Sequence, residues 1–226
     1  MKIYAFIFVR GGSKGLPGKN IKNLGGLPLF VHAIRLAQSM DQVQGIFVST
    51  DCMRIAAIAK DFGARVIIRP EELASDTASE WKAWQHAITY IDNILKDSFD
   101  VFLSLPATSP LRSREDVENC IQALDGKTDI VITVSPSARS PYFNMVCEGE
   151  DGYAHILLGG STFERRQDAP ATFDITTVAY VSRPRFILTH SNMFEGRVKA
   201  VQVPKERSLD IDDEFDFKIA EALHKL

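Results

Sequence analysis

Short apolar runs and segments with helical spacing alternate along the first part of the chain. The apolar runs predict strands, and they are residues 3–9, 46–49, 66–68, 101–105 and 130–134. The segments between them repeat apolar residues at the helical period, which predicts helices, and they are residues 28–40, 53–62, 80–95 and 113–124. Strands that alternate with helices predict an α/β fold, with helices on both faces of a mostly parallel sheet in a three-layer arrangement.

The alternation of predicted strands and helices stops after residue 134. Residues 135–160 carry prolines, glycines and short mixed segments, which indicate extended strands or an arm rather than another strand and helix. Strands are predicted again at 173–181 and 198–203, followed by a helix at 214–226 whose apolar face holds Phe215, Ile219, Leu223 and Leu226. We expect one domain over residues 1–226, with an inserted arm at about 135–170 that is the candidate oligomer contact.

Two local patterns refine these elements. Ser113, followed three positions later by Asp116, resembles a capping box with Asp in place of the usual Glu, and it predicts that a helix begins there. Trp81 and Trp84 share a helical face with Ile88 and Ile91. This stripe predicts helix packing in the core rather than a platform for stacked bases.

Composition and charge exclude several classes of protein. The 26 basic and 29 acidic side chains leave a formal net charge of −3, so no overall field attracts nucleic acid. No apolar run approaches the roughly 20 residues that span a bilayer, and the chain enters a strand-like segment directly, without a signal peptide. The 3 cysteines show neither disulfide nor zinc spacing. We expect a cytoplasmic protein with no nucleic-acid or membrane partner.

Candidate chemistry begins in a glycine-rich loop directly after the first predicted strand. Residues 10–20 combine glycines with the cations Arg10, Lys14 and Lys19. Glycines let backbone amides approach an anion closely, and these cations would offset most of the roughly four negative charges of a nucleoside triphosphate. Neither the Walker A spacing nor a GxGxxG motif fits the loop. We expect a phosphate site at the carboxyl edge of the sheet.

A second chemical signal lies near the end of the sequence. Asp210 and Asp212 are two positions apart, so in an extended segment both point to the same face. Such a pair supplies hard oxygen ligands suited to Mg²⁺, which can bridge to phosphate. Asp213 and Glu214 fit the N-terminal charges of the following helix. The sequence therefore predicts a magnesium site at Asp210 and Asp212, and it identifies no general base.

The loop and several other stretches together resemble the acylneuraminate cytidylyltransferase family, the CMP-N-acetylneuraminic acid synthetases. The loop contributes Arg10-Gly-Gly-Ser-Lys-Gly and Gly18-Lys19-Asn20. The other stretches follow in order along nearly the whole chain, and they are residues 48–51, 69–70, 73–77, 108–112, 166–167 with Pro170, and 210–216. The resemblance implies the Rossmann-like fold of the nucleotide-diphospho-sugar transferases, with a small dimerisation arm.

The same resemblance implies an activity and a set of site residues. A member would transfer CMP from CTP to a sialic-acid-like 2-keto-3-deoxy sugar acid and release pyrophosphate, with Mg²⁺, as a homodimer, in cell-surface polysaccharide biosynthesis. The nucleotide-binding residues would be Arg10, Gly11, Gly12, Ser13, Lys14, Lys19, Asn20, Arg69, Asp76 and Thr77. The catalytic residues would be Arg10, Lys14, Lys19, Asp210 and Asp212. The sugar-binding residues would be Thr108, Arg112, Arg166 and Tyr180.

Two departures from the family pattern lie on the expected sugar side. The usual Gln-Pro before Thr108 is Pro106-Ala107 here, and the usual Asn-Gly before the tyrosine is replaced by Thr176-Thr177. These departures leave the identity of the acceptor sugar open, and a relative of sialic acid such as legionaminic acid or another modified nonulosonate is an alternative. Two alternatives also remain: another sugar nucleotidyltransferase, for octulosonic acid or a different nucleotide, and a catalytically silent nucleotide-binding protein.

Overall fold

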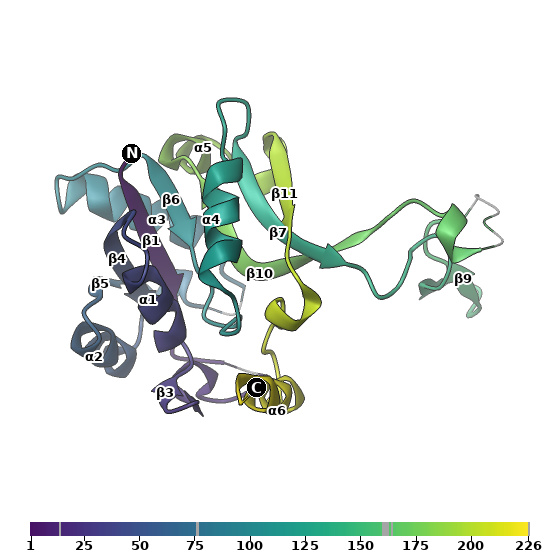
Figure 1. Ribbon diagram of the computed structural model, residues 1–226, viewed down its shortest axis with the longest axis horizontal. Coiled ribbons are helices and arrows are strands. Elements are labelled where there is room, and N and C mark those ends of the chain that lie inside the picture. The colour runs from purple at the N-terminus through teal and green to yellow at the C-terminus, as the bar shows by residue number, and fades with distance from the viewer. Residues whose placement is uncertain (14, 76, 160–162, 164, 226) are drawn as a thin grey trace.

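A mostly parallel sheet forms the centre of the molecule. The computed structural model describes residues 1–13, 15–75, 77–159, 163 and 165–225, and for Arg166 the backbone alone. Within these residues the strand order is β11-β7-β10-β6-β1-β4-β5 (Figure 1). The strands are β1 Ile3–Phe8, β4 Val43–Thr50, β5 Arg65–Ile68, β6 Val101–Ser104, β7 Ile130–Pro136, β10 Phe173–Ser182 and β11 Val198–Gln202. Strand β10 is antiparallel to both β6 and β7, and the other neighbours are parallel. The predicted fold class is confirmed.

Helices cover both faces because side chains alternate along each strand. Ile3, Ala5 and Ile7 of β1 face one apolar cluster, and Tyr4 and Phe6 face the other. The first cluster is covered by α1 Val31–Gln38, α2 Met53–Asp61 and α4 Arg114–Ala123. The second is covered by α3 Glu80–Asn93 and α5 Pro184–Thr189. Among the described residues, no helix is both long and apolar enough to cross a membrane.

Both local patterns read from the sequence are present. The Ser113 side chain accepts a hydrogen bond from the backbone of Asp116, and the Asp116 side chain accepts one from the backbone of Ser113, so α4 begins with a complete capping box. Trp81 and Trp84 of α3 are buried against the sheet. Both predictions are confirmed.

A third apolar cluster joins the two ends of the chain. Leu16 and Leu24 near the N-terminus are buried against Ile211 and Phe217 near the C-terminus. Helix α6, Glu214–His224, supplies Phe217, and the short hairpin of β2 Asn23–Leu24 and β3 Leu27–Pro28 supplies Leu24. This cluster places the acidic segment before α6 beside the glycine-rich loop after β1.

Three expectations about helices are corrected. The helix expected at 28–40 begins only at Val31, because residues 23–28 form the β2–β3 hairpin. Helix α5 was not expected at all. On α6 the buried residues are Phe217 and Ala220, whereas Phe215 is 71% exposed, because the helix docks on Leu16 and Ile211. The prediction was therefore wrong for Phe215, whereas Ile219 and Leu223 are half-buried and Leu226 lies outside the described residues.

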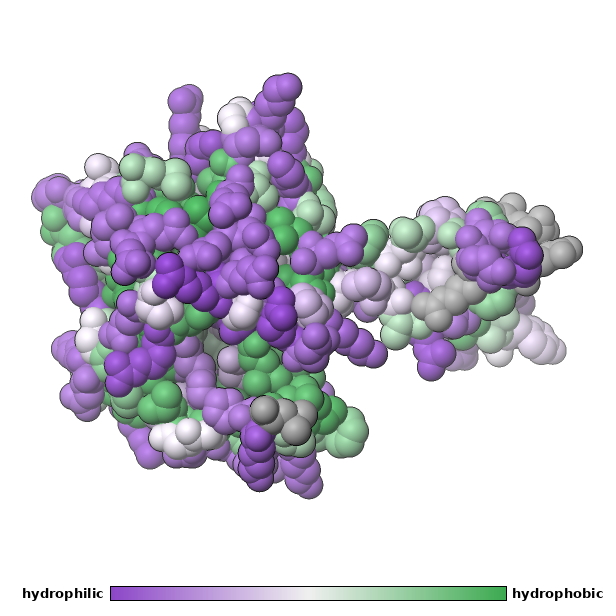
Figure 2. All heavy atoms as spheres, in the orientation of Figure 1, coloured by the Kyte–Doolittle hydropathy of each residue, from purple (hydrophilic) through white to green (hydrophobic). Residues whose placement is uncertain are grey.

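An arm projects from the body between β7 and β10 (Figure 1). It carries the antiparallel hairpin of β8 Val146–Glu148 and β9 Ala154–Ile156, in which Val146 pairs with Ile156. All residues of both short strands are exposed. Figure 2 shows hydrophobic residues among the polar ones on the visible face of the arm.

Candidate active site

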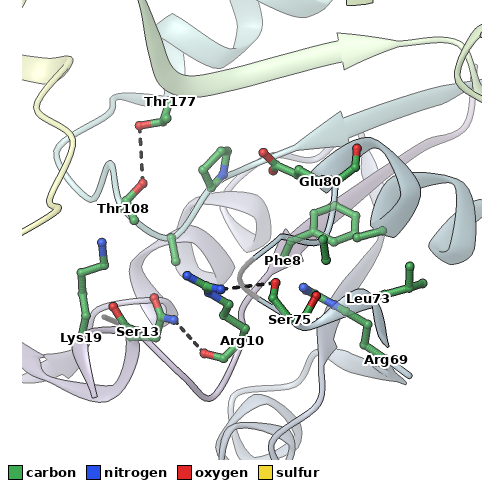
Figure 3. Close-up of a pocket in the computed structure, with 16 residues that line it drawn as sticks. Phe8, Arg10, Ser13, Lys19, Arg69, Leu73, Ser75, Glu80, Thr108 and Thr177 are labelled. Atoms are coloured by element: carbon green, nitrogen blue, oxygen red, sulfur yellow. Dashed lines mark hydrogen bonds between the residues drawn. The ribbon is translucent and has the colours of Figure 1, made fainter. Parts of the chain in front are cut away.

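A cleft of about 340 Å³ opens at the carboxyl edge of the sheet. Segments that follow β1, β5 and β6 contribute to its wall, as does the start of α3 (Figure 3). The lining residues are Phe8, Arg10, Ser13, Lys19, Asn20, Arg69, Leu73, Ser75, Ala78, Ser79, Glu80, Ala83, Pro106, Ala107, Thr108 and Thr177. In open α/β sheets this edge is where ligands bind.

The glycine-rich loop is fastened to the body of the protein by hydrogen bonds. The backbone amide of Gly11 donates to Asp51 Oδ1 at 2.9 Å, and Asn20 Nδ2 donates to the carbonyl oxygen of Arg10 at 3.0 Å. Gly18 has φ +69°, a conformation that side chains with a Cβ rarely adopt. These contacts hold Arg10 at the wall of the cleft, where its guanidinium lies 3.5 Å from the carbonyl oxygen of Ser75.

Lys19 connects this loop to the acidic segment before α6. Its side chain is almost fully buried, and Nζ donates to the carbonyl oxygen of Ile211 and lies 3.3 Å from Asp212 Oδ1. The ammonium group therefore stands between the wall of the cleft and the two aspartates. A cation in this position lowers the electrostatic energy of a phosphate bound beside it.

Arg69 occupies the other end of the cleft, with Phe8, Leu73 and Glu80 (Figure 3). Its Nε donates to Ser49 Oγ at 3.1 Å, its Nη2 donates to the carbonyl oxygen of Ser49 at 2.7 Å, and its guanidinium lies 5.6 Å from the centre of the Phe8 ring. Burial lowers the pKa of Arg69 from its ordinary value. The ring and the fixed guanidinium suit a planar polar group such as a nucleobase.

Asp210 and Asp212 are the candidate ligands for a divalent cation. Asp210 is half-buried, and its Oδ1 has no hydrogen-bond partner among the described residues. Burial raises the pKa of Asp210, while the nearby hydroxyl groups of Thr108 and Thr177 oppose the rise. Asp212 is exposed.

Asp210 and Asp212 are a suitable pair of ligands for Mg²⁺ if the oxygens of a bound triphosphate complete the coordination of the cation. No group of three or more acidic, histidine or cysteine side chains is gathered for a metal in the described part of the chain. Protein sites for Mg²⁺ commonly supply only one or two carboxylates and leave the other positions to substrate phosphates and water. The unpartnered Oδ1 of Asp210 is a suitable oxygen for this purpose.

Two predicted sugar-binding residues lie behind the wall of the cleft. Arg112 is 7% exposed, and its Nη2 donates to the carbonyl oxygen of Pro106. Burial lowers the pKa of Arg112 to about 9. Tyr180 packs its ring 5.4 Å from that of Trp84, and burial raises its pKa to about 12. Neither side chain lines the cleft, so any direct contact with a sugar stays a prediction.

The cleft brings together only part of the predicted site. Arg10, Ser13, Lys19, Asn20, Arg69 and Thr108 line it. Asp210 and Asp212 adjoin it through Thr108 and Lys19, whereas Gly11, Gly12 and Thr77 do not line it. Lys14, Asp76 and the side chain of Arg166 lie outside the described residues.

Sequence reasoning missed Phe8, Ser75 and Glu80, which line the cleft. Glu80 is the first residue of α3, a position where an acidic side chain is common in any helix. The detectable signal was its position, directly after a polar loop that follows a strand, because such loops end at the carboxyl edge of the sheet.

Known proteins resemble this chain over most of its length. Residues 4–225 match the family model described as cytidylyltransferase. A post-translational flagellin modification protein B of Campylobacter coli is 33% identical, over 99% of this chain and 95% of its own length. A CMP-N,N'-diacetyllegionaminic acid synthase of Campylobacter jejuni is 30% identical, over 100% of this chain and 96% of its own. An N-acylneuraminate cytidylyltransferase of Streptococcus agalactiae is 31% identical over 96% of this chain, which spans 52% of that longer protein.

Solved structures share the fold. A CMP:2-keto-3-deoxy-manno-octonic acid synthetase complexed with CTP has a TM-score of 0.72 at 18% identity, covering 100% of this chain and 99% of its own. A 4-diphosphocytidyl-2C-methyl-D-erythritol synthase has a TM-score of 0.70 at 12% identity, covering 99% of each chain. At these identities the likeness establishes the architecture alone.

Proposed function

This chain belongs to the cytidylyltransferase family and is a nucleotidyltransferase, and from that premise we propose that it transfers CMP from CTP to a sialic-acid-like 2-keto-3-deoxy sugar acid. The observation that carries the proposal is the contact of Lys19 with Ile211 and Asp212, which joins a cationic glycine-rich loop to a pair of aspartates at one cleft. Two relatives that match 100% and 96% of this chain are named for nonulosonate substrates, legionaminic acid and N-acylneuraminate, although this chain spans only 52% of the second protein.

In the proposed reaction the anomeric hydroxyl oxygen of the sugar acid attacks the α-phosphorus of CTP. A new phosphorus–oxygen bond forms, the bond from the α-phosphorus to the bridging oxygen of the β-phosphate breaks, pyrophosphate leaves, and the hydroxyl proton passes to water. Arg10 and Lys19 would offset the charge that builds on the phosphate oxygens. Arg69 and Phe8 would hold the base end of the nucleotide, which aligns the reacting atoms.

Asp210 and Asp212 would hold Mg²⁺ in this scheme, and the cation would supply charge neutralisation at the triphosphate. We expect Asp210→Asn to reduce pyrophosphate release at least ~10²-fold, the scale for loss of one electrostatic stabiliser. Asp213→Asn is the matched control, because Asn also caps helices well and Asp213 is the exposed N-cap of α6. Wild-type turnover in Asp210→Asn would refute the metal assignment.

The acceptor and the nucleotide are tested by one screen. CTP, UTP, ATP and GTP are each combined with sialic, legionaminic, pseudaminic or octulosonic acid and Mg²⁺, and pyrophosphate release is measured. We expect turnover with CTP and a nine-carbon acid. Turnover with octulosonic acid or with another nucleotide would favour a different sugar nucleotidyltransferase. Tight CTP binding without turnover across all acids would favour a catalytically silent protein.

We further propose that two copies associate through the arm to form a homodimer. Apolar side chains stand exposed along the arm and its base: Val146, Tyr153, Ile156, Leu157, Leu158, Phe173 and Ile175. A concentration of exposed apolar side chains in one segment is typical of a protein interface. A cytoplasmic location, and a role in making precursors for cell-surface polysaccharides, are parts of the same proposal.

Light scattering tests the dimer directly. We expect a dimer at micromolar concentration, and a monomer when Leu157 and Leu158 are both replaced by Glu. Met53→Glu is the control, since Met53 is a 70% exposed apolar residue on α2, away from the arm. A monomeric wild-type protein would overturn the proposal.

A further inference from the structure

One acidic side chain lines a cleft whose other charged residues are cations. Among the described lining residues, Glu80 is the sole acid, whereas Arg10, Lys19 and Arg69 are basic. A carboxylate in a cleft for a polyanion repels the ligand, unless it meets a hydrogen-bond donor on that ligand. Glu80 therefore needs a donor that lies away from the triphosphate.

Glu80 lies at the end of the cleft that Phe8 and Arg69 form, and Figure 3 shows Lys19 well apart from it. Trp84 Nε1 donates to Glu80 Oε1 at 3.3 Å, and the centroids of the Trp84 and Phe8 rings are 6.4 Å apart. The guanidinium of Arg69 lies 5.6 Å from the centre of the same Phe8 ring. The carboxylate, the aromatic ring and the guanidinium therefore belong to one part of the cleft.

Both charged groups keep capacity to bind a ligand. Trp84 occupies one oxygen of Glu80, and among the described residues no hydrogen bond reaches the other oxygen, Oε2. Arg69 uses Nε and Nη2 on Ser49, and no residue in the described part of the chain accepts from its Nη1. A carboxylate only accepts hydrogen bonds and a guanidinium only donates them. This end of the cleft thus presents a free acceptor and a free donor near an aromatic ring.

The base of CTP carries the complementary pattern. The N4 amine of cytosine donates hydrogen bonds, and Glu and Asp are the side chains that accept from N4 in protein–nucleic acid recognition. The carbonyl oxygen O2 of cytosine is an acceptor. Uracil has a carbonyl oxygen, O4, in place of the amine, and a carboxylate at that position repels it. A carboxylate facing position 4 of the ring therefore distinguishes the two pyrimidines.

We propose that Glu80 is a specificity-determining residue that accepts a hydrogen bond from the N4 amine of cytosine, while Arg69 donates to an acceptor atom of the same base. The inference rests on the proposed transfer of CMP from CTP, with the base held at Phe8 and Arg69, and extends it to the atom that separates CTP from UTP. The hydrogen bond from Trp84 orients the carboxylate before the nucleotide arrives. Less side-chain freedom is then lost on binding.

The test compares the binding of two nucleotides without turnover. CTP and UTP, each with Mg²⁺ and no sugar acid, are titrated calorimetrically into the full chain and its variants. Glu80→Gln removes the charge and supplies an amide group that can donate to O4 of uracil. Glu80→Asp keeps the charge on a side chain one methylene shorter. Glu72→Gln is the matched control, because Glu72 is exposed and lies outside the lining of the cleft, next to the lining residue Leu73.

We expect the wild-type protein to bind CTP ~10–100-fold more tightly than UTP, the scale of one hydrogen bond to a charged group. Glu80→Gln should lose most of that preference. Glu80→Asp should weaken CTP binding without improving UTP binding, and Glu72→Gln should bind both nucleotides as the wild type does.

Three results would count against the proposal. An unchanged preference for CTP in Glu80→Gln would overturn the role of Glu80 alone. Equal losses for CTP and UTP would overturn it too, since they would indicate a contact with the ribose that both nucleotides share. Equal binding of CTP and UTP by the wild type would contradict the proposed nucleotide as well. Should Glu80→Gln fail to fold, Glu80→Asp makes the test, and wild-type CTP affinity in that variant would be contrary to the proposal.

Discussion

The backbone of Asp212 lies against Gly15, so closely that a Cβ added to Gly15 would come within 2.4 Å of the Asp212 carbonyl oxygen. No side chain can be accommodated there without moving the glycine-rich loop or the acidic segment. We therefore expect Gly15→Ala to separate these two parts of the site. Displacements of about 1 Å can cost ~10²-fold in rate, and a loss of that size in kcat/KM for pyrophosphate release is the expected result.

Gly126→Ala is the control for this prediction. Gly126 follows α4, and an added Cβ there would meet nothing within 4 Å. Its activity and Tm should match those of the wild type. Full activity in Gly15→Ala would show that the loop and the acidic segment need not stay in contact.

Local signals in the sequence were sufficient for most of the fold. Apolar periodicity located the main strands, and the Trp81 and Trp84 stripe identified a packed face, because burial imposes those patterns within a single element. Apolar periodicity could not identify the buried face of α6. Phe215 and Phe217 are both apolar and point in different directions, and only contact with Leu16 and Ile211 decides which is buried.

The same limit applies to the site. The glycine-rich loop and the aspartate pair were each recognisable from residue type and spacing. The contact between the loop and the aspartate pair could not be predicted, because Lys19 and Ile211 are 192 positions apart in sequence. The third apolar cluster brings the two segments together. The register of β10 against β7 also shifts between Thr176 and Tyr180, where Thr133 of β7 donates a hydrogen bond to the carbonyl oxygen of Thr176. No pattern within residues 173–182 reveals it.

Lys19→Met should weaken both the fold and nucleotide binding. The substitution leaves the carbonyl oxygen of Ile211 without its donor, at a cost of about 1–3 kcal/mol in the free energy of unfolding. It also removes a charge expected to face the triphosphate, so the Kd for CTP should rise. Urea unfolding and calorimetric titration measure the two effects.

Lys22→Met provides the comparison for Lys19→Met. Lys22 forms an ion pair with Glu214 at 2.6 Å in which both side chains are substantially exposed. Pairs of this kind contribute about 0–1 kcal/mol, so this variant should lose less stability and keep its CTP affinity. Equal losses in both variants would contradict a special role for Lys19.

The raised pKa of Glu80 leads us to expect that the stability of the folded protein depends on pH. Loss of water around the carboxyl group at the cleft wall raises its pKa, although the residue as a whole is exposed and the hydrogen bond from Trp84 and the charge of Arg69 oppose the rise. The folded state therefore holds this proton more tightly than the unfolded chain does. Its contribution to stability is present below the unfolded pKa of about 4.3 and is lost as pH rises through the higher folded pKa.

Glu80→Gln removes this titration. The difference in Tm between Glu80→Gln and the wild type should become more positive as pH rises from about 4 to about 7. Glu221→Gln, on α6 and outside the lining of the cleft, is the control for the replacement of a glutamate by glutamine. A constant difference for Glu80→Gln would contradict the raised pKa.

Asp116 joins the start of α4 to the segment before the acidic motif. Its buried carboxylate accepts hydrogen bonds from Ser113 N at 2.9 Å and from Arg207 Nε and Nη2, both at 2.9 Å. Asp116→Ala removes a helix cap and a charged pair, so the free energy of unfolding in urea should fall by about 2–4 kcal/mol. Asp41→Ala, whose fully exposed carboxylate lies 4.0 Å from Arg114, should change it by less than ~0.5 kcal/mol. Equal stability of the two variants would mean that the Asp116 contacts contribute little in solution.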